Sequence, residues 1–570
     1  MGRIKQKRRS QSQSALALAT TSAGAEEAAA SGVAIGRSAE GFGDGAYNST
    51  DVLISQSSAQ SSWFSEVKWV SRHHQKLLET SQDAKASSSK TVDIPEKASP
   101  DYVLKPASTE SKPLPKEKTH DSLLAELNQI KEQLMPAAQM CADAINKYQS
   151  TKKAAPEYEF RQARSTCNPY ERLGETFSKN YSNRNTKKSR KRKNSHLQAP
   201  CGLSQFINRS AIKLANIDAL IGFSLTSTAM DQEQDPGMQT KQKSKFVFVD
   251  LCGAPGGFSE YILYRYVHPA NIQNTRQSPN NESHENGNNC IKVCHGFGMS
   301  LSGSNNDGKG LLWNLDHLKR YHLSTNNTHD TSNTQSLSYH VCNGADNTGS
   351  IYSWKNILQL QREIISTVSA RRDSTNCHKP LANLVVADGG FDAQRDSNNQ
   401  EALAHKIIVS QTAAALSILR PGGKFVLKMF GFREEATRIV LQYLYDCFDK
   451  MTFVKPILSR PASAERYLVC QGYNCPGVEW DGFVWSEKMI TPPKASGETK
   501  ACTQNYTPLD DLMDSFDLDM VQLNIDTCRS IINYLHAKKE SIEEGDNAAA
   551  YENQKQYINI REYEATWRLL

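Results

Sequence analysis

The sequence predicts an α/β protein built on a doubly wound parallel sheet, preceded by a disordered N-terminal region. Between residues 206 and 471, short apolar runs alternate with longer stretches of helical periodicity. That alternation is typical of repeated βαβ units. A glycine-rich turn follows the first apolar run, and charged residues stand beside later ones. The carboxyl ends of parallel strands are where the ligand crevice of such folds lies.

The N-terminal region has a composition that does not support a packed core. Residues 1–118 are rich in serine, alanine, glutamine and lysine and show little apolar periodicity, so we expect them to be disordered. The whole chain of 570 residues is only 38% hydrophobic, which agrees with a part that does not fold. A helical lead-in is predicted over residues 119–154, and Pro136 is expected to break or kink it.

Charge, cysteine content and apolar run length favour an intracellular protein with a nucleic-acid partner over a disulfide-rich or membrane-spanning one. A net charge of +6 makes the chain mildly basic, which is compatible with a nucleic-acid partner. The 13 cysteines are scattered and odd in number, so we expect reduced thiols and no metal site. No apolar run is long enough to span a membrane. The basic run 187–193 is a nuclear import signal, a patch for RNA phosphates or a solvated charge run.

The clearest motif is a strand, a turn and a helix within residues 246–266. Phe246 to Val249 is a β-branched and aromatic run that predicts a buried strand ending at Asp250. Glycines and a proline then force a tight turn, and the apolar spacing becomes helical from Phe258. The glycine spacing matches neither a dinucleotide fingerprint nor a P-loop. The pattern indicates a ligand close to the backbone, and its alternative is a plain strand-to-helix turn.

The other elements continue the alternation. Helices are predicted over 206–220 and 401–419, the second ended by Pro-Gly-Gly, and residues 507–570 are expected to be mostly helical. Asparagine- and serine-rich stretches at 271–290 and 324–335 are expected to be surface loops. Further strands are predicted at residues 291–296, 339–342, 384–387, 424–429, 453–457 and 466–471.

Two sets of motifs resemble FtsJ-type RNA 2′-O-methyltransferases, and most closely the cap-specific mRNA (nucleoside-2′-O-)-methyltransferase 1 family. One is the turn Asp-Leu-Cys-Gly-Ala-Pro-Gly-Gly-Phe-Ser-Glu-Tyr. The other matches the family's Lys-Asp-Lys-Glu tetrad: Lys213 in Arg-Ser-Ala-Ile-Lys, Asp388 in Ala-Asp-Gly-Gly-Phe, Lys428 in Val-Leu-Lys-Met-Phe and Glu465 in Ser-Ala-Glu-Arg-Tyr. The resemblance covers residues 155–570 apart from the insertions and the basic run. It implies a Rossmann-like methyltransferase sheet with flanking helices.

The resemblance and electrostatic reasoning together imply a role for each member of the tetrad. Lys428 is expected to take the proton of the ribose 2′-hydroxyl, and Asp388 to orient Lys428 and the ribose. Lys213 is expected to raise the local positive potential and so to hold the pKa of Lys428 down. Glu465 is expected to position Lys213.

The resemblance also implies the cofactor and the substrate contacts. The implied cofactor is S-adenosyl-L-methionine, bound by Asn208, Cys252, Gly253, Ala254, Pro255, Gly256, Gly257, Phe258, Asp346 and Asn347. Arg164, Asn398 and Ser463 are expected to contact the cap or the first nucleotides. Family members often carry asparagine at the position of Ser463.

The function that this resemblance implies is methylation of the ribose 2′-oxygen of the first transcribed nucleotide of capped mRNA. The expected partner is the capped 5′ end of mRNA, with the transcription or capping machinery as a further candidate, and the expected state is a nuclear monomer. Two alternatives remain open: an FtsJ-type ribosomal or transfer RNA methyltransferase, and a catalytically silent RNA-binding scaffold. Ribosomal RNA relatives usually read Asp-Gly-Ala-Pro where Asp388 begins Asp-Gly-Gly-Phe, and the complete tetrad argues against the scaffold.

Overall fold

The computed structural model describes most of the chain from residue 120 onward and a short segment before it. The described residues are 67–71, 120–149, 153–168, 170, 173, 205–226, 245–268, 293–302, 312–325, 336–368, 382–390, 399–474, 481–490, 507–545, 563, 566–567 and 569. Asn398, the basic run 187–193 and the predicted loop 271–290 lie outside them.

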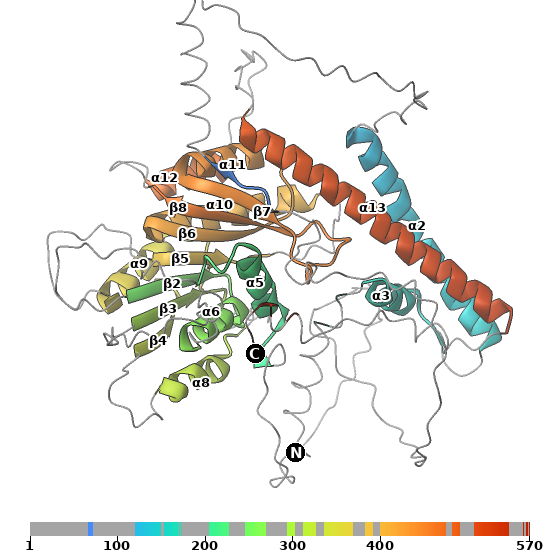
Figure 1. Ribbon diagram of the computed structural model, residues 1–570, viewed down its shortest axis with the longest axis horizontal. Coiled ribbons are helices and arrows are strands. Elements are labelled where there is room, and N and C mark those ends of the chain that lie inside the picture. The colour runs from blue at the N-terminus through green and yellow to red at the C-terminus, as the bar shows by residue number, and fades with distance from the viewer. Residues whose placement is uncertain are drawn as a thin grey trace, which may run out of the picture. The chain divides into compact units, whose positions relative to one another are not determined.

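Within the described residues, the centre of the fold is an eight-stranded sheet with the order β1-β7-β8-β6-β5-β2-β3-β4 (Figure 1). Strands β4, β3, β2, β5 and β6 are parallel, and β8 runs antiparallel to both β6 and β7. The strands are β1 (Val70–Ser71), β2 (Lys245–Leu251), β3 (Val293–Met299), β4 (Ser336–Val341), β5 (Ala382–Ala387), β6 (Leu419–Met429), β7 (Phe448–Val454) and β8 (Arg466–Tyr473). The chain builds outward from β2 to β4 and then returns to β5, so the predicted doubly wound α/β fold is confirmed.

Each face of the sheet is covered by its own helices, because successive side chains of a strand point to opposite faces. Val247 and Val249 of β2 join a core with α9 (Trp354–Val368), α10 (Gln400–Ile418), α11 (Glu435–Cys447) and α12 (Gly482–Ile490). Phe246 and Phe248 join a second core with α5 (Arg209–Leu220), α6 (Gly257–Val267) and α8 (Leu315–Thr325). Both faces of β2 are therefore buried, as its uninterrupted apolar run predicts.

Helix α2 (His120–Tyr148) continues through Pro136, so the predicted break there is wrong. It packs against α13 (Pro508–Glu543), and the two helices lie side by side in Figure 1. Leu127 and Ile130 contact α13 before the proline, and Ala138 and Cys141 do so after it. Packing on both sides of Pro136 outweighs the loss of one backbone hydrogen bond.

Strand β1 lies inside the region predicted to be disordered, and that prediction is wrong for residues 67–71. Val70 pairs with Met451 and Ser71 with Lys450, so β1 covers the outer edge of β7. The Thr452 hydroxyl donates to the carbonyl of Lys68 at 2.6 Å. An exposed strand edge offers unpaired backbone groups, and this segment covers part of it.

The boundaries of two strands, β6 and β7, differ from the predicted ones. Strand β6 starts at Leu419 and includes the Pro-Gly-Gly that was expected only to end the preceding helix. Strand β7 ends at Val454, so the strand predicted at 453–457 begins and ends too late. Among the described helices, none combines the length and the apolar character needed to cross a membrane.

Candidate active site

The predicted catalytic residues lie close together at the carboxyl-terminal ends of the parallel strands, which form one end of the sheet. Leu251, the last residue of β2, pairs with Met299 of β3 and Ala387 of β5, so these strands end side by side. Asp388 directly follows β5, and Lys428 is the next-to-last residue of β6. Glu465 directly precedes β8, and because β8 runs antiparallel to β6, its start lies at the same edge.

The four side chains of the predicted tetrad form one chain of contacts. Lys213 Nζ lies 2.6 Å from Glu465 Oε1, and Lys428 Nζ lies 4.0 Å from Glu465 Oε2. Lys428 Nζ also donates to Asp388 Oδ1 at 2.9 Å and to the Asp388 carbonyl at 3.1 Å. Each of these side chains is between 13% and 16% exposed. The cluster is therefore largely shielded from water but reachable from outside.

Three hydroxyl groups that the sequence analysis did not identify hold the two acids in place. Ser210 Oγ donates to Asp388 Oδ2 at 2.9 Å, and Tyr467 OH donates to Asp388 Oδ1 at 2.9 Å. Ser459 Oγ donates to Glu465 Oε1 at 2.5 Å. Ser210 and Tyr467 belong to the motifs around Lys213 and Glu465, so their closeness in sequence was a usable signal. Ser459 lies six residues before Glu465 and begins the longer motif Ser-Arg-Pro-Ala-Ser-Ala-Glu-Arg-Tyr, so it carried the same signal.

The charges of the tetrad fix the direction of its pKa shifts. Burial lowers the pKa of Lys428, but the carboxylates of Asp388 and Glu465 raise it more, so the net pKa lies above its ordinary value. Burial raises the pKa of Glu465, but Lys213 and Lys428 lower it much further. The expectation that Lys213 holds the pKa of Lys428 down is therefore wrong for this arrangement. Lys213 is itself paired with Glu465, while Lys428 lies against Asp388.

The glycine turn after β2 closes over a buried carboxylate. A Cβ on Gly253 would lie 2.0 Å from Asp250 Oδ1, so only glycine fits there. Asp250 Oδ2 accepts hydrogen bonds from the Ser259 amide at 3.1 Å and the Ser259 hydroxyl at 2.7 Å, whereas Oδ1 is buried and has no partner among the residues that the structure describes. Burial, with help from Asp388, raises the pKa of Asp250 to about 7.

Asn208 joins the turn to the helix that carries Lys213. Its Oδ1 accepts from the amides of Ser210 at 3.0 Å and Ala211 at 3.4 Å and so caps α5. A Cβ on Gly257 would lie 2.1 Å from the same oxygen. The predicted cofactor residue Asn208 therefore lies directly on the turn, and its capping role explains why α5 begins at residue 209.

Asp346 and Asn347 lie in a loop after β4, at the same sheet edge as the turn. Asp346 Oδ1 accepts from the Thr348 amide at 2.9 Å and the Thr348 hydroxyl at 2.7 Å, which lowers the pKa of Asp346. The Asn347 carbonyl accepts from Ser302 Oγ at 3.0 Å, and Ser302 lies shortly after β3. The loop is thus tied to the end of the neighbouring strand.

The predicted substrate residues lie on different elements. Arg164 is on α3 (Pro156–Thr166), with its guanidinium 5.8 Å from the Phe160 ring, and α3 packs against α2 and α13. Ser463 lies two residues before Glu465, and its carbonyl and hydroxyl contact Lys455 Nζ at 2.7 and 3.3 Å. The structure therefore places Ser463 beside the tetrad and Arg164 on a separate layer of helices.

Comparisons with known proteins match the central part of the chain to a methyltransferase family. Residues 206–473 match the family model described as FtsJ-like methyltransferase. The chain is 28% identical over 314 residues to the cap-specific mRNA (nucleoside-2′-O-)-methyltransferase 1 of Xenopus laevis, a match that covers 55% of this chain and 28% of the relative. It is 30% identical over 329 residues to the protein of the same name from Drosophila melanogaster, covering 57% and 31%. The chain thus spans less than a third of the length of these relatives.

The matched range runs from the start of the Asn208 segment to the end of β8. It contains the sheet from β2 to β8, the glycine turn and all four members of the tetrad. Residues 206–473 therefore resemble an FtsJ-like methyltransferase domain, and the candidate active site lies within them.

Proposed function

We propose that the chain is an S-adenosylmethionine-dependent enzyme that methylates the ribose 2′-oxygen of the first transcribed nucleotide of capped mRNA. The tetrad carries this proposal, because two lysines and two acids lie in one chain of contacts at the ligand-binding edge of the sheet. The relatives named above support the substrate, since both are described as cap-specific mRNA 2′-O-methyltransferases.

The glycine turn has the features that a methyl-donor site requires. S-adenosylmethionine would supply an electrophilic methyl group and carries a cationic amino group. The buried Asp250 Oδ1 has no hydrogen-bond partner in the structure, so it is an acceptor that fits such a cation. The residues proposed to hold the cofactor are Asn208, the turn from Cys252 to Phe258, Asp346 and Asn347.

Lys428 is the proposed acceptor of the 2′-hydroxyl proton. Its ammonium form is favoured by Asp388 and Glu465, so Lys428 must release a proton before it can accept one. Asp388 fixes the Lys428 amine at 2.9 Å, and Glu465 bridges Lys428 and Lys213. A fixed amine beside the reacting oxygen supplies orientation, which is worth on the order of 7–11 kcal/mol in well-aligned reactions.

We further propose that Arg164, Asn398 and Ser463 contact the cap or the first nucleotides, and that the enzyme works in the nucleus. Arg164 carries a guanidinium suited to phosphate oxygens. Ser463 lies next to the tetrad in the loop before β8, where a first nucleotide would have to approach.

The deciding experiment is methyl transfer from labelled S-adenosylmethionine to three short RNAs of one sequence. Capped RNA should be methylated and RNA with a 5′ triphosphate hardly at all. Capped RNA that already carries a 2′-O-methyl group on its first nucleotide should accept nothing. Equal transfer to capped and uncapped RNA would favour the ribosomal or transfer RNA alternative, and no transfer to any RNA would favour the silent scaffold.

Two lysines of β6 provide a matched pair of variants for this assay. Lys428→Ala should abolish transfer while calorimetry still detects binding of S-adenosylhomocysteine. Lys424→Ala removes a lysine from the middle of the same strand, four residues before Lys428, where its amine donates to the Ser224 carbonyl, and should keep transfer. Retained transfer by Lys428→Ala would exclude Lys428 as the proton acceptor.

A further inference from the structure

A buried lysine outside the tetrad, Lys455, fastens the loop that delivers Glu465. Lys455 directly follows β7 and is 0% exposed, and the loop runs from it to Glu465, just before β8. Its Nζ donates to the Ser463 carbonyl at 2.7 Å and to the Glu465 carbonyl at 2.6 Å, and lies 3.3 Å from Ser463 Oγ. An amine at the start of the loop therefore holds the end of the loop.

The first half of the same loop is fastened to the helix that carries Lys213. The Ile457 amide donates to Asn216 Oδ1 at 3.0 Å, and the Arg209 guanidinium donates to the Leu458 carbonyl at 2.9 Å. Both Asn216 and Arg209 belong to α5. Lys455 is thus the link between a loop segment anchored on α5 and the carboxylate that must reach Lys213.

The chemistry of a buried amine suits this task. Burial lowers the pKa of Lys455 well below its ordinary value, and although Glu465 opposes this shift, Arg466 and Lys213 add to it. The Lys455 amine has three oxygen acceptors for its N–H groups, namely the Ser463 carbonyl, the Ser463 hydroxyl and the Glu465 carbonyl. Because its bond to Glu465 goes to the backbone carbonyl, the Glu465 carboxylate stays committed to Lys213 and Lys428.

We propose that Lys455 is a positioning residue, which aims the Glu465 carboxylate at Lys213 and Lys428 by clamping the backbone of residues 463 and 465. This inference rests on the proposed role of the tetrad in methyl transfer. Lys455 does not touch substrate in this role, because its amine is enclosed by the loop and the sheet.

A double-mutant cycle tests whether Lys455 acts through Glu465. Lys455→Met should lower kcat on capped RNA by about 10- to 100-fold with little change in the KM for S-adenosylmethionine, because a displacement on the order of 1 Å can cost about 100-fold. In a Glu465→Gln background, the same change should lower kcat further by less than about threefold, because the group it positions is already disabled. Losses that simply multiply, or an unchanged kcat in Lys455→Met, would overturn the proposal.

Lys424→Met is the matched control, since it removes a partly buried lysine from the middle of β6, whose amine contacts the Ser224 carbonyl and no member of the tetrad. It should keep kcat even where it lowers the melting temperature. Equal losses of kcat in the two variants would mean that Lys455 contributes only general stability. If Lys455→Met does not fold, Lys455→Gln keeps an N–H donor and enters the same cycle with the same criterion.

Hydrogen exchange separates this inference from the proposed substrate. Lys455→Met should speed amide exchange across residues 459–466, whereas Lys424→Met should leave that segment as it is. Unchanged exchange in Lys455→Met would overturn the clamp whatever the substrate is. If the wild-type chain methylates no capped RNA, the proposed function fails, and the exchange result still decides whether Lys455 holds the loop.

Discussion

At the scale of single side chains, Asp388, which follows β5, depends on a tyrosine from β8, two strands away in the sheet. Tyr467 is fully buried, and its hydroxyl donates to Asp388 Oδ1 at 2.9 Å, the same oxygen that Lys428 contacts. Tyr467→Phe should lower the single-turnover rate by about 10- to 150-fold, because a hydrogen bond to a charged group is worth about 1.5–3 kcal/mol. Rapid-quench measurement of methyl transfer gives this rate directly.

The control for that change lies on the same strand. Tyr473 is also buried in β8, but its hydroxyl donates to the Leu416 carbonyl at 2.9 Å, away from the tetrad. Tyr473→Phe should leave the single-turnover rate unchanged. If both variants slow transfer equally, the effect of Tyr467→Phe comes from weakened packing of β8 and not from Asp388.

The raised pKa of Lys428 predicts a particular dependence of rate on pH. The proton acceptor is the deprotonated amine, and a raised pKa shifts the formation of that amine to higher pH. The rate of methyl transfer should therefore rise about tenfold per pH unit and keep rising past the ordinary lysine pKa of about 10.4. The profile can be measured on a capped RNA whose later nucleotides are 2′-O-methylated and so resist alkaline cleavage. A plateau below about pH 9 would contradict a raised pKa in the reacting complex.

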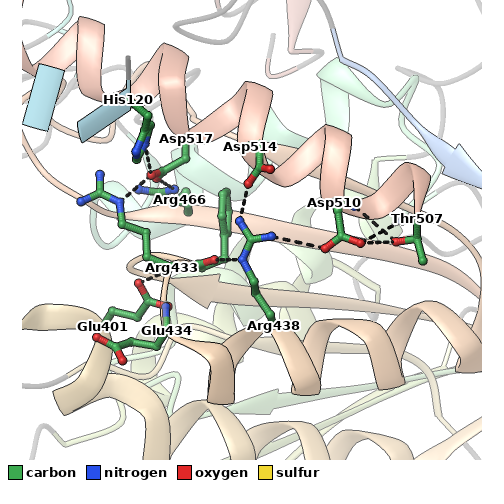
Figure 2. A network of polar contacts seen from close by, with 11 residues as sticks. His120, Glu401, Arg433, Glu434, Arg438, Arg466, Thr507, Asp510, Asp514 and Asp517 are labelled. Carbon is green, nitrogen blue, oxygen red and sulfur yellow. Dashed lines mark hydrogen bonds and ion pairs between the residues drawn. The ribbon is translucent and has the colours of Figure 1, made fainter. Parts of the chain in front are cut away.

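At the scale of elements, α13 is tied to the strand that follows Glu465. Figure 2 shows Asp517 of α13 in contact with two arginines and a histidine from other elements. Its carboxylate lies 2.8 Å from Arg466 of β8, 2.6 Å from Arg433 after β6, and 3.1 Å from the His120 ring at the start of α2. Arg466 and Asp517 are each 4% exposed, so this pair is a buried one.

Asp517→Ala should lower the free energy of unfolding by about 3–5 kcal/mol, because it leaves the buried Arg466 without its acid. Asp514→Ala on the same helix breaks a surface contact with Arg438, and its loss should stay below about 1 kcal/mol. Urea denaturation of the two variants measures the difference. Similar losses would mean that the Arg466 pair is no stronger than a surface pair.

The same carboxylate predicts how stability changes in acid. Burial raises the pKa of Asp517, but Arg466 and Arg433 lower it more, to about 2. An unfolded aspartate has a pKa of about 3.9, so this contribution is complete above about pH 4 and is lost as the pH falls toward 2. Between about pH 5 and 3, the wild-type chain should lose part of its advantage over Asp517→Asn. A constant difference across that range would contradict the lowered pKa.

Because β1 pairs with β7, two N-terminal truncations that begin just before and just after β1 should differ in their free energy of unfolding. A chain that begins at residue 67 keeps the carbonyls of Lys68 and Ser71, which accept from Thr452 and Tyr445 at 2.6 and 3.1 Å. A chain that begins at residue 72 should be less stable by about 2 kcal/mol, since two hydrogen bonds at about 1 kcal/mol each are lost. Calorimetric melting of the two chains compares them, and equal stability would show that the edge of β7 does not need β1.

At the scale of the whole molecule, the sequence predicted those features that local pattern determines. The apolar run before Asp250 predicted β2, and the match to the family's tetrad, together with positions at strand ends, predicted Asp388, Lys428 and Glu465. Parallel strands bring their carboxyl ends together, so residues at strand ends meet even when they are far apart in sequence. The order of strands and helices along the chain is therefore enough to explain why Asp388, Lys428 and Glu465 lie close together.

Other features depend on distances that no local pattern encodes. The pKa of Lys428 is raised because two acids from separate segments lie close to it, and the sequence could not show which charge would be nearest. Lys455 and Ser459 act through a loop whose path is set by α5. Pro136 reads as a helix breaker until α13, nearly 400 residues later, packs on both sides of it.

The ion pair between Arg466 and Asp517 also has a consequence for the order in which the protein is synthesised and folds. The two residues are 51 positions apart in the sequence, and Asp517 is translated after Arg466. At about 5–20 residues per second, a ribosome needs roughly 3–10 seconds to travel from one to the other. During that interval the nascent chain already contains every member of the tetrad. Arg466, next to Glu465, still lacks the carboxylate of Asp517. Helix α13, which is translated after every member of the tetrad, thus completes the support of the site, and a chain released before α13 carries an uncompensated charge that exposes it to chaperones and proteases.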